Sequence, residues 1–257
     1  MTKPIDFSVF SSLKIGSLLE VRIIDSEIPK QDMFIIGGAN NLLFSPSPSQ
    51  PLAMLSKVYD YIEIRDGFLH IGGATPNGKI FSYAKKNNIA GFEILPKLPG
   101  KIGGAVYMNA GLKGDEISQN LVSIKTSSGY LPKENIEFEY RKSSIDDIIY
   151  EAVFEIKKGF SVELEKKFKN MRSNQPSEPS AGSCFKNPKD DFAGRIIEAV
   201  GLKGYRVGGA AFSEVHANFL VNLGGASFFD AKSLIDEAKK RAYDRFGVEL
   251  ELEIKIV

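Results

Sequence analysis

The chain contains, at residues 98–111, the stretch Leu98-Pro99-Gly100-Lys101-Ile102-Gly103-Gly104-Ala105-Val106-Tyr107-Met108-Asn109-Ala110-Gly111. These fourteen residues include four glycines and no acidic side chain, a composition that makes a poor core strand. Glycines allow positive φ angles and let backbone N–H groups approach an anionic ligand closely. The stretch therefore predicts a backbone cradle for a nucleotide.

A second glycine-rich segment, Gly37 to Leu43, directly follows a predicted strand at Met33–Ile36. Its glycines suit a pyrophosphate, and an ordinary turn after a strand is the alternative interpretation. Other nucleotide motifs are not indicated. Residues 73–79 have Walker A spacing, but Ile80 replaces the hydroxyl residue that binds Mg²⁺. The chain also has no G-x-G-x-x-G, so a Rossmann dinucleotide fold is not expected.

The remaining pattern predicts mixed strands and helices without regular βαβ spacing, which favours an α+β fold. Residues 248–256 alternate between apolar and charged side chains, which predicts a half-buried C-terminal strand. The other predicted strands lie at 68–71, 121–126 with a hairpin turn at 127–129, 148–156 and 219–222, and the predicted helices at 79–88, 161–174, 192–200 and 227–246.

The composition excludes several classes of protein. The 257 residues carry 33 Lys and Arg against 32 Asp and Glu, and this net charge of +1 gives no reason to expect a nucleic-acid or membrane partner. One cysteine excludes an internal disulfide, and with only two histidines no metal site is predicted. The N-terminus lacks the apolar region of a signal peptide, and no run reaches transmembrane length. We expect a cytoplasmic enzyme or small-ligand binder.

Polar candidates for a site lie in four places. Residues 179–188 (Pro-Ser-Ala-Gly-Ser-Cys-Phe-Lys-Asn-Pro) present a serine hydroxyl among small residues, where neither helix nor strand forms easily, which predicts a pocket loop. Arg141 either sits in a solvated loop or faces a carboxylate or enolate. His216 either binds a ligand or caps a turn. Glu253 lies on the polar face of the last predicted strand, and nothing local singles it out. Cys184 is expected to be a packing residue.

In their order and spacing these segments resemble the UDP-N-acetylenolpyruvoylglucosamine reductase family of peptidoglycan synthesis. The resemblance spans almost the whole chain, and the short length resembles the compact subclass, which lacks an extra substrate-covering loop. The matching segments are residues 10–16, 37–43, 98–111, 140–143, 179–188, 193–204, 208–210, 213–222 and 253–255.

The resemblance implies a fold and a reaction. FAD is expected between two subdomains of the vanillyl-alcohol-oxidase (PCMH) type, at residues 1–65 and 66–158. A C-terminal α+β substrate domain is expected at 159–257, with residues 248–257 returning to the active site. In the family NADPH reduces the flavin, and UDP-N-acetylglucosamine enolpyruvate then takes a hydride and becomes UDP-N-acetylmuramate. A monomer is expected.

The resemblance also implies roles for individual residues. Arg141 corresponds to the cation that stabilises the enolate-like intermediate, Glu253 to its acidic partner and Ser183 to the proton donor. The residues expected to bind substrate are Tyr140, Lys186, Asn187 and His216. Those expected to bind FAD are Gly37, Gly38, Ala39, Asn40, Asn41, Leu42, Pro99, Gly100, Gly103, Gly104, Asn109, Ala110, Gly111 and Arg172.

Some residues depart from the family pattern. The first glycine loop has Ala39 and Asn40 where Gly-Ser is usual; Ala39 keeps a small side chain, and Asn40 tolerates left-handed backbone geometry. A basic residue that commonly contacts a substrate phosphate is replaced by Asn174 or Gln175. Two alternatives stay open: another flavin oxidoreductase of this fold that acts on a hydroxylated substrate, and a nucleotide-sugar binder that has lost its activity. The intact Ser183 argues against the second.

Overall fold

The structure is a computed structural model that describes residues 1–112, 114–171 and 174–257. Its residues fall into two compact units. Unit 1 consists of Met1–Lys3, Val21–Gly38 and Pro51–Ser173, and unit 2 of Pro4–Glu20, Ala39–Gln50 and Asn174–Val257. The predicted three-domain division therefore stays a prediction, while each unit can be described by its own core.

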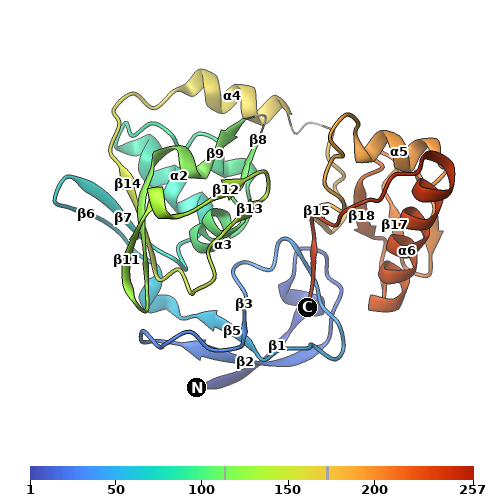
Figure 1. Cartoon of the computed structure of the whole chain (residues 1–257), viewed down its shortest axis with the longest axis horizontal. Coiled ribbons are helices and arrows are strands. Elements are labelled where there is room, and N and C mark those ends of the chain that lie inside the picture. The colour runs from blue at the N-terminus through green and yellow to red at the C-terminus, as the bar shows by residue number, and fades with distance from the viewer. Residues whose placement is uncertain (113, 172–173) are drawn as a thin grey trace. The chain divides into compact units, whose positions relative to one another are not determined.

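The main sheet of unit 1 is antiparallel, with the strand order β11-β10-β14-β7-β6 (Figure 1). The predicted hairpin is confirmed, because Thr126 pairs with Gly129 across the turn. Side chains alternate between the two faces, so Ala152 and Phe154 enter the core while Glu151 points to the opposite face. The strands are β6 (Ile62–Arg65), β7 (Phe68–Gly72), β10 (Leu121–Thr126), β11 (Gly129–Pro132) and β14 (Glu151–Glu155).

Helices pack on the core face of this sheet. The predicted helix at 79–88 is present as α2 (Asn77–Lys86), and the glycine-rich stretch supplies the six-residue α3 (Ile102–Tyr107). Both contribute to one apolar cluster with the sheet, as does Phe168 of α4 (Val162–Met171). This helix within residues 98–111 was not predicted, but Ile102, Ala105 and Val106 recur at helical spacing and are buried in this cluster.

A smaller sheet has the order β1-β2-β5-β3, in which β2 and β3 each run parallel to β5. Its strands are β1 (Thr2–Asp6), β2 (Leu18–Ile24), β3 (Phe34–Ile35) and β5 (Leu52–Leu55). Short elements complete this part of the chain: β8 (Gly111–Leu112), β9 (Asp115–Glu116), β12 (Phe138–Glu139), β13 (Lys142–Ser143), and the 3₁₀ turns at Lys57–Tyr59, Leu95–Lys97, Ile117–Asn120 and Lys133–Asn135.

Unit 2 is built on an antiparallel sheet of order β15-β18-β17-β16 with two helices packed against it. The long predicted helix is confirmed as α6 (Phe228–Phe246), which begins at a capping box of Ser227 and Asp230 and ends at Gly247 with φ 66°. The other elements are β15 (Ser180–Ser183), α5 (Ala193–Ala199), β16 (Arg206–Val207), β17 (Ala210–Phe212) and β18 (Phe219–Asn222).

The N-terminal and C-terminal segments of unit 2 join its core. α1 (Phe7–Phe10) places Phe7 against Phe44, with ring centroids 3.7 Å apart. β4 (Leu42–Leu43) pairs in parallel with β19 (Lys255–Ile256). The predicted strand over 248–256 was therefore wrong in length. Its alternation was correct for burial, since Leu250 and Ile254 are buried, but most of its backbone bonds to loops instead of to a neighbouring strand.

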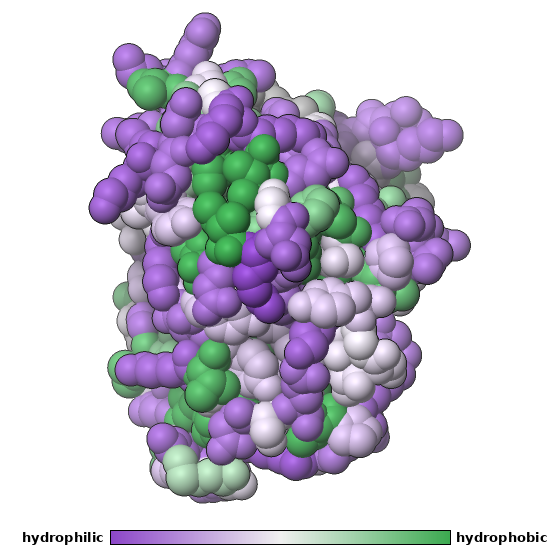
Figure 2. Space-filling model, turned by 90° about the vertical axis from the view of Figure 1, so that its left-hand side faces the viewer, coloured by the Kyte–Doolittle hydropathy of each residue, from purple (hydrophilic) through white to green (hydrophobic). Residues whose placement is uncertain are grey.

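Hydrophilic side chains dominate the face drawn in Figure 2, and hydrophobic side chains gather there in small patches. Exposed hydrophobic residues of unit 1 include Ile64 and Phe68, on the two sides of the turn between β6 and β7. Isolated apolar side chains of this kind are ordinary on a folded surface. No helix in the described part of the chain has the length and apolar content needed to cross a bilayer.

Candidate active site

In unit 1 the glycine-rich stretch is anchored to α2 by one asparagine. Asn77 is buried, its backbone N–H donates to the Gly100 carbonyl at 2.9 Å, and its side-chain amide donates to the Leu98 carbonyl at 2.7 Å. Gly100 has φ 127°, a conformation that favours glycine. The turn that leads into α3 is therefore fixed by the Asn77 side chain and by a glycine-only backbone geometry.

The glycines of this stretch have two different surroundings. A Cβ on Gly103 would lie 2.9 Å from the Gly73 carbonyl oxygen, so Gly103 is required by packing within the protein. A Cβ on Gly104 would meet nothing within 4 Å. A Cβ on Gly37 would lie 3.9 Å from the Gly104 Cα, so the two predicted glycine loops lie close together. Around Gly104 the protein thus exposes bare backbone beside open space.

The far end of the stretch holds the predicted cation. The Arg141 Nη2 donates to the Gly111 carbonyl at 2.7 Å, and its guanidinium lies 5.0 Å from the centre of the Tyr140 ring. Asn109 is buried, and its amide donates to Glu116 at 2.7 Å and to the Glu139 carbonyl at 3.1 Å. Unit 1 therefore brings together Arg141, Tyr140 and residues 109–111 of the predicted cofactor site.

In unit 2 the N-terminal segment supports the end of the first glycine loop. The Ser12 N–H donates to the Ala39 carbonyl at 3.1 Å, and its hydroxyl donates to the Asn40 carbonyl at 3.3 Å. The left-handed residue of this loop is Ala39, with φ 53°, and the tolerance of Asn40 for that geometry is not used. The turn falls one residue earlier, where glycine is usual in the family and where an alanine carries some strain.

The Ser183 segment departs from the loop that its composition predicted. Residues 180–183 form β15, which pairs with β18, so the prediction that no strand forms here was wrong. The two prolines lie outside the strand, and Gly182, with φ 81°, lies where the register shifts between Ser180 and Ser183. This irregularity places Ser183 at the end of a strand beside the pocket described below.

The C-terminal segment binds through its backbone both to the first glycine loop and to the residue that follows β15. The Glu253 N–H donates to the Cys184 carbonyl at 2.9 Å, and the Asn41 amide donates to the Glu253 carbonyl at 2.9 Å. The Lys255 N–H donates back to the Asn41 carbonyl at 2.9 Å. Glu253 is therefore held between the glycine loop and the residue that follows Ser183, a connection that nothing in the local sequence indicated.

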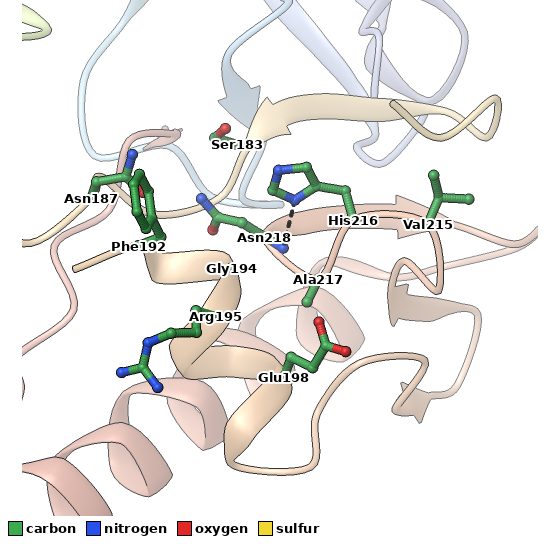
Figure 3. A pocket seen from close by; sticks show the side chains of 10 residues that line it. All are labelled: Ser183, Asn187, Phe192, Gly194, Arg195, Glu198, Val215, His216, Ala217 and Asn218. Carbon is green, nitrogen blue, oxygen red and sulfur yellow. Dashed lines mark hydrogen bonds between the residues drawn. The ribbon is translucent and has the colours of Figure 1, made fainter. Parts of the chain in front are cut away.

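A pocket of about 410 Å³ opens beside Ser183 in unit 2 (Figure 3). Three predicted site residues line it, Ser183, Asn187 and His216. Lys186 does not line the pocket, and its ammonium is bonded to Glu251. The other lining residues are Phe192, Gly194, Arg195, Glu198, Val215, Ala217 and Asn218.

Asn218 also lines this pocket, was not predicted as a site residue, and bonds to both residues that follow Ser183. Its side chain accepts from the Phe185 N–H at 3.0 Å and donates to the Phe185 carbonyl at 2.8 Å. Its carbonyl accepts from the Cys184 N–H at 2.7 Å. A polar residue directly before an apolar strand was the only available signal, and it does not distinguish a clamp of this kind from an ordinary turn.

Two groups near Ser183 have pKa values moved by burial. Desolvation lowers the pKa of His216, which outweighs the opposing effect of a backbone hydrogen bond, so the imidazole is neutral at neutral pH. Burial raises the pKa of the Cys184 thiol, and Cys184 is fully buried in the core of unit 2. It is a packing residue, not a nucleophile. The described residues contain no cluster of three or more side chains that could bind a metal ion.

Comparison with known proteins decides the family. Residues 175–257 match the model of the C-terminal domain of UDP-N-acetylenolpyruvoylglucosamine reductase. The reductase of Helicobacter hepaticus is 49% identical over 100% of this chain and 99% of its own length. The chain belongs to the UDP-N-acetylenolpyruvoylglucosamine reductase family.

Further members agree with this assignment. The reductase of Campylobacter jejuni strain RM1221 is 49% identical over 98% of this chain and 99% of its own length. The crystal structure of the enzyme from Thermus caldophilus superposes with a TM-score of 0.88 at 26% identity, covering 100% of this chain and 98% of that one. The predicted α+β fold is therefore confirmed as that of the reductase family.

Members of the reductase family are flavin-dependent oxidoreductases, so the chain is expected to hold a flavin. The residues present fit such a group. Gly37 and Gly104 expose adjacent backbone, and the open space at Gly104 is where a side chain would otherwise project. Arg172, a further predicted cofactor contact, lies outside the described residues.

Proposed function

We propose that the chain reduces UDP-N-acetylglucosamine enolpyruvate to UDP-N-acetylmuramate in peptidoglycan synthesis, with NADPH as hydride donor and FAD as cofactor. One observation carries the proposal: Ser183 lines the same pocket as Asn187 and His216, and the backbone of Glu253 is bonded to the residue after Ser183. Three residues that only the family resemblance had linked thus line one pocket, and the Glu253 backbone is bonded next to Ser183 within the same unit.

The residues that would hold FAD are those of the two glycine loops, chiefly Gly37, Gly38, Gly103 and Gly104. When bound, FAD supplies the hydride carrier between NADPH and the vinyl C3 of the substrate. The protein must then stabilise the negative charge that hydride addition places on C2 and the adjacent carboxylate. A preorganised cation lowers the barrier to forming such a charge.

Arg141 is proposed as that cation. Its bond to the Gly111 carbonyl and its position over the Tyr140 ring restrict the guanidinium, so less reorientation is needed when charge develops. Tyr140 is proposed to contact the substrate beside it. Glu253 is proposed to orient the intermediate, and its backbone bonds to Asn41 and Cys184 limit its movement.

Ser183 is proposed to deliver the proton to C2. The Ser183 O–H bond breaks, the C2–H bond forms, and the hydroxyl regains its proton from solvent after product release. A serine is a weak acid, but an enolate is basic enough to accept its proton. Asn187 and His216 are proposed to hold the nucleotide-sugar part of the substrate in the adjoining pocket. Lys186 is proposed to contact the substrate only after release from Glu251.

We further propose that the protein acts as a monomer in the cytoplasm, where NADPH and nucleotide sugars are available. Steady-state turnover with NADPH and the enolpyruvyl nucleotide sugar tests the reaction. The purified protein should be yellow, and NADPH should bleach its flavin absorbance anaerobically. A protein that cannot be loaded with FAD would overturn the proposal. Flavin reduction by an alcohol, with reoxidation by oxygen, would favour an oxidase of the same fold.

The Ser183→Ala variant tests the proton donor. NADPH should reduce its flavin at the normal rate, because that half-reaction needs no proton from Ser183. Reoxidation by the enolpyruvyl substrate should slow at least about a hundredfold, the lower range for loss of a general acid. Stopped-flow absorbance measures both half-reactions, and Ser180→Ala, in the same strand, is the matched control. Unchanged reoxidation in Ser183→Ala would remove Ser183 from the role.

A further inference from the structure

The hydrogen-bond role of His216 is set by the protein backbone. The Asn218 N–H donates to His216 Nδ1 at 3.2 Å, so Nδ1 is an acceptor and, in the neutral ring, the proton resides on Nε2. Figure 3 shows the second ring nitrogen turned away from this bond, toward the side of the pocket where Ser183 lies.

Two neighbours fix the position of the ring. On one side the His216 ring packs against Phe219, with centroids 5.0 Å apart. Gly194, in the first turn of α5, leaves room for the ring edge at Cε1. A Cβ on Gly194 would lie 3.2 Å from His216 Cε1, closer than ordinary contact. Any side chain at position 194 would therefore press on the ring.

A backbone N–H also fixes the side-chain amide of Asn187 as a hydrogen-bond donor toward the pocket. Its side-chain oxygen accepts from the Ala193 N–H at 3.1 Å, which leaves its NH₂ group for the pocket it lines. The pocket thus contains two side chains, His216 and Asn187, that a backbone N–H fixes as donors, together with the Ser183 hydroxyl. Its charged residues have partners elsewhere, since Arg195 is bonded to Asp191 and Glu198 to Lys203. Such a set suits an oxygen that only accepts hydrogen bonds, as in a phosphate group.

We propose that His216 positions the substrate as a neutral, single-tautomer donor from Nε2–H to a phosphate oxygen of the nucleoside-diphosphate sugar, and that Asn218 and Gly194 are positioning residues for it. The proposal rests on the proposed function for the identity of the sugar nucleotide. Asn218 also clamps Phe185 and Cys184, so one buried residue holds both the ring and the strand end that carries Ser183.

The first test is structural and needs no substrate. In ¹⁵N-labelled flavin-loaded protein at pH 7.5, long-range ¹H–¹⁵N spectra should show His216 with a protonated Nε2 and a bare Nδ1. The chain has two histidines, so the spectrum of the His216→Asn variant assigns the signals. An imidazolium, or a proton on Nδ1, would overturn the proposal.

The second test separates the two ring nitrogens. In His216→Gln the amide nitrogen can occupy the Nε2 position and keep the donor, whereas in His216→Asn the side chain reaches only the Nδ1 position. Binding of UDP-N-acetylglucosamine, measured by calorimetry on flavin-loaded protein, should weaken about tenfold or more in His216→Asn, as for a lost bond to a charged group. His216→Gln should stay within about threefold of wild type. Equal effects of the two variants, in either direction, would contradict the donor role.

Gly194→Ala tests the positioning of the His216 ring without changing any polar atom. Alanine favours the helix, so the variant should unfold at the wild-type temperature or above, while its Cβ displaces the ring and weakens UDP-N-acetylglucosamine binding as His216→Asn does. Wild-type binding by Gly194→Ala would overturn its positioning role, and a wild-type protein that binds no UDP-N-acetylglucosamine would overturn the phosphate contact. Normal binding without turnover would instead refute only the proposed reaction.

Discussion

Two adjacent glycines of the cradle should respond in opposite ways to the same added methyl group. Gly103 and Gly104 both lie in α3, so replacement by alanine favours the helix at each by about 0.5–1 kcal/mol. The Gly103 methyl would lie 2.9 Å from the Gly73 carbonyl oxygen and 3.5 Å from that of Ile149. These are backbone atoms and cannot move aside as a side chain can. Overpacking of this kind costs about 1–3 kcal/mol, so Gly103→Ala should be destabilised by about 1–2 kcal/mol net.

The Gly104 methyl meets no protein atom within 4 Å, so the flavin-free Gly104→Ala protein should be as stable as wild type or slightly more stable. If the open space beside Gly104 belongs to the flavin site, the methyl instead meets the cofactor. We expect FAD affinity to fall by about 1–3 kcal/mol, or roughly ten- to a hundredfold, by the same overpacking argument.

The assay uses flavin-free protein prepared from each variant. Urea unfolding gives the stability, and quenching of FAD fluorescence on titration gives the dissociation constant. Gly114→Ala is a control for a methyl added in open space outside the helix, although its positive φ of 90° adds strain. Wild-type FAD affinity in Gly104→Ala would refute the assignment of this space to the flavin, and wild-type stability in Gly103→Ala would refute the packing argument.

Three further predictions concern the scaffold. Glu151 is buried and accepts from Tyr61, Arg65 and Tyr130 while bonded to His70, so Glu151→Gln should lose about 2–4 kcal/mol in urea unfolding, against at most about 1 kcal/mol for Tyr130→Phe. Burial raises the pKa of Glu151, but these hydrogen bonds outweigh burial and hold the pKa below its usual value. The stabilisation is therefore complete above about pH 4.5 and is lost as the pH falls further. If the stabilities of wild type and Glu151→Gln fail to converge in acid, the ionised Glu151 carboxylate is not the source of the stabilisation. Ala39→Gly should raise the unfolding temperature slightly, because glycine relieves about 1 kcal/mol of strain at φ 53°, and calorimetry showing a lower temperature would contradict it. Gly208→Ala should destabilise unit 2 by more than about 2 kcal/mol, because its Cβ would lie 2.5 Å from the Asp230 carboxylate that caps α6. Gly225→Ala, with a similar φ and no neighbour within 4 Å, should cost only about 1 kcal/mol. Equal losses of stability in thermal unfolding would show that the φ angle alone matters.

Local sequence signals predicted those elements whose stabilising interactions are themselves local. α6 was predicted because its capping box, its apolar spacing and its terminal glycine lie within the helix sequence or next to it. The hairpin of β10 and β11 was predicted from its turn residues for the same reason. β15 was missed because its partner β18 lies about 40 residues further along the chain, and a strand with small residues has little propensity of its own.

The candidate site was predictable only as separate segments. Ser183, Arg141 and Glu253 could each be named through the family resemblance, but the contacts that hold them are made by backbone atoms and by polar residues without a motif. Asn218 illustrates the difficulty, because its side chain bonds to the backbone N–H and carbonyl of Phe185, 33 residues away. Periodicity and composition describe faces of elements, and they do not report which backbone amide a side-chain oxygen will meet.

The C-terminal segment shows why the predicted burial pattern was correct although the predicted strand length was not. Alternation requires only that Leu250 and Ile254 face the core, and they do so whether the backbone pairs with a strand or with loops. The pairing with loops matters for the site. The Glu253 backbone bonds to Asn41 on one side and to Cys184 on the other, so the C-terminal segment joins the glycine loop to the end of the Ser183 strand. A continuous strand would have used those backbone groups for its neighbour, and the two loops would have lost their shared support.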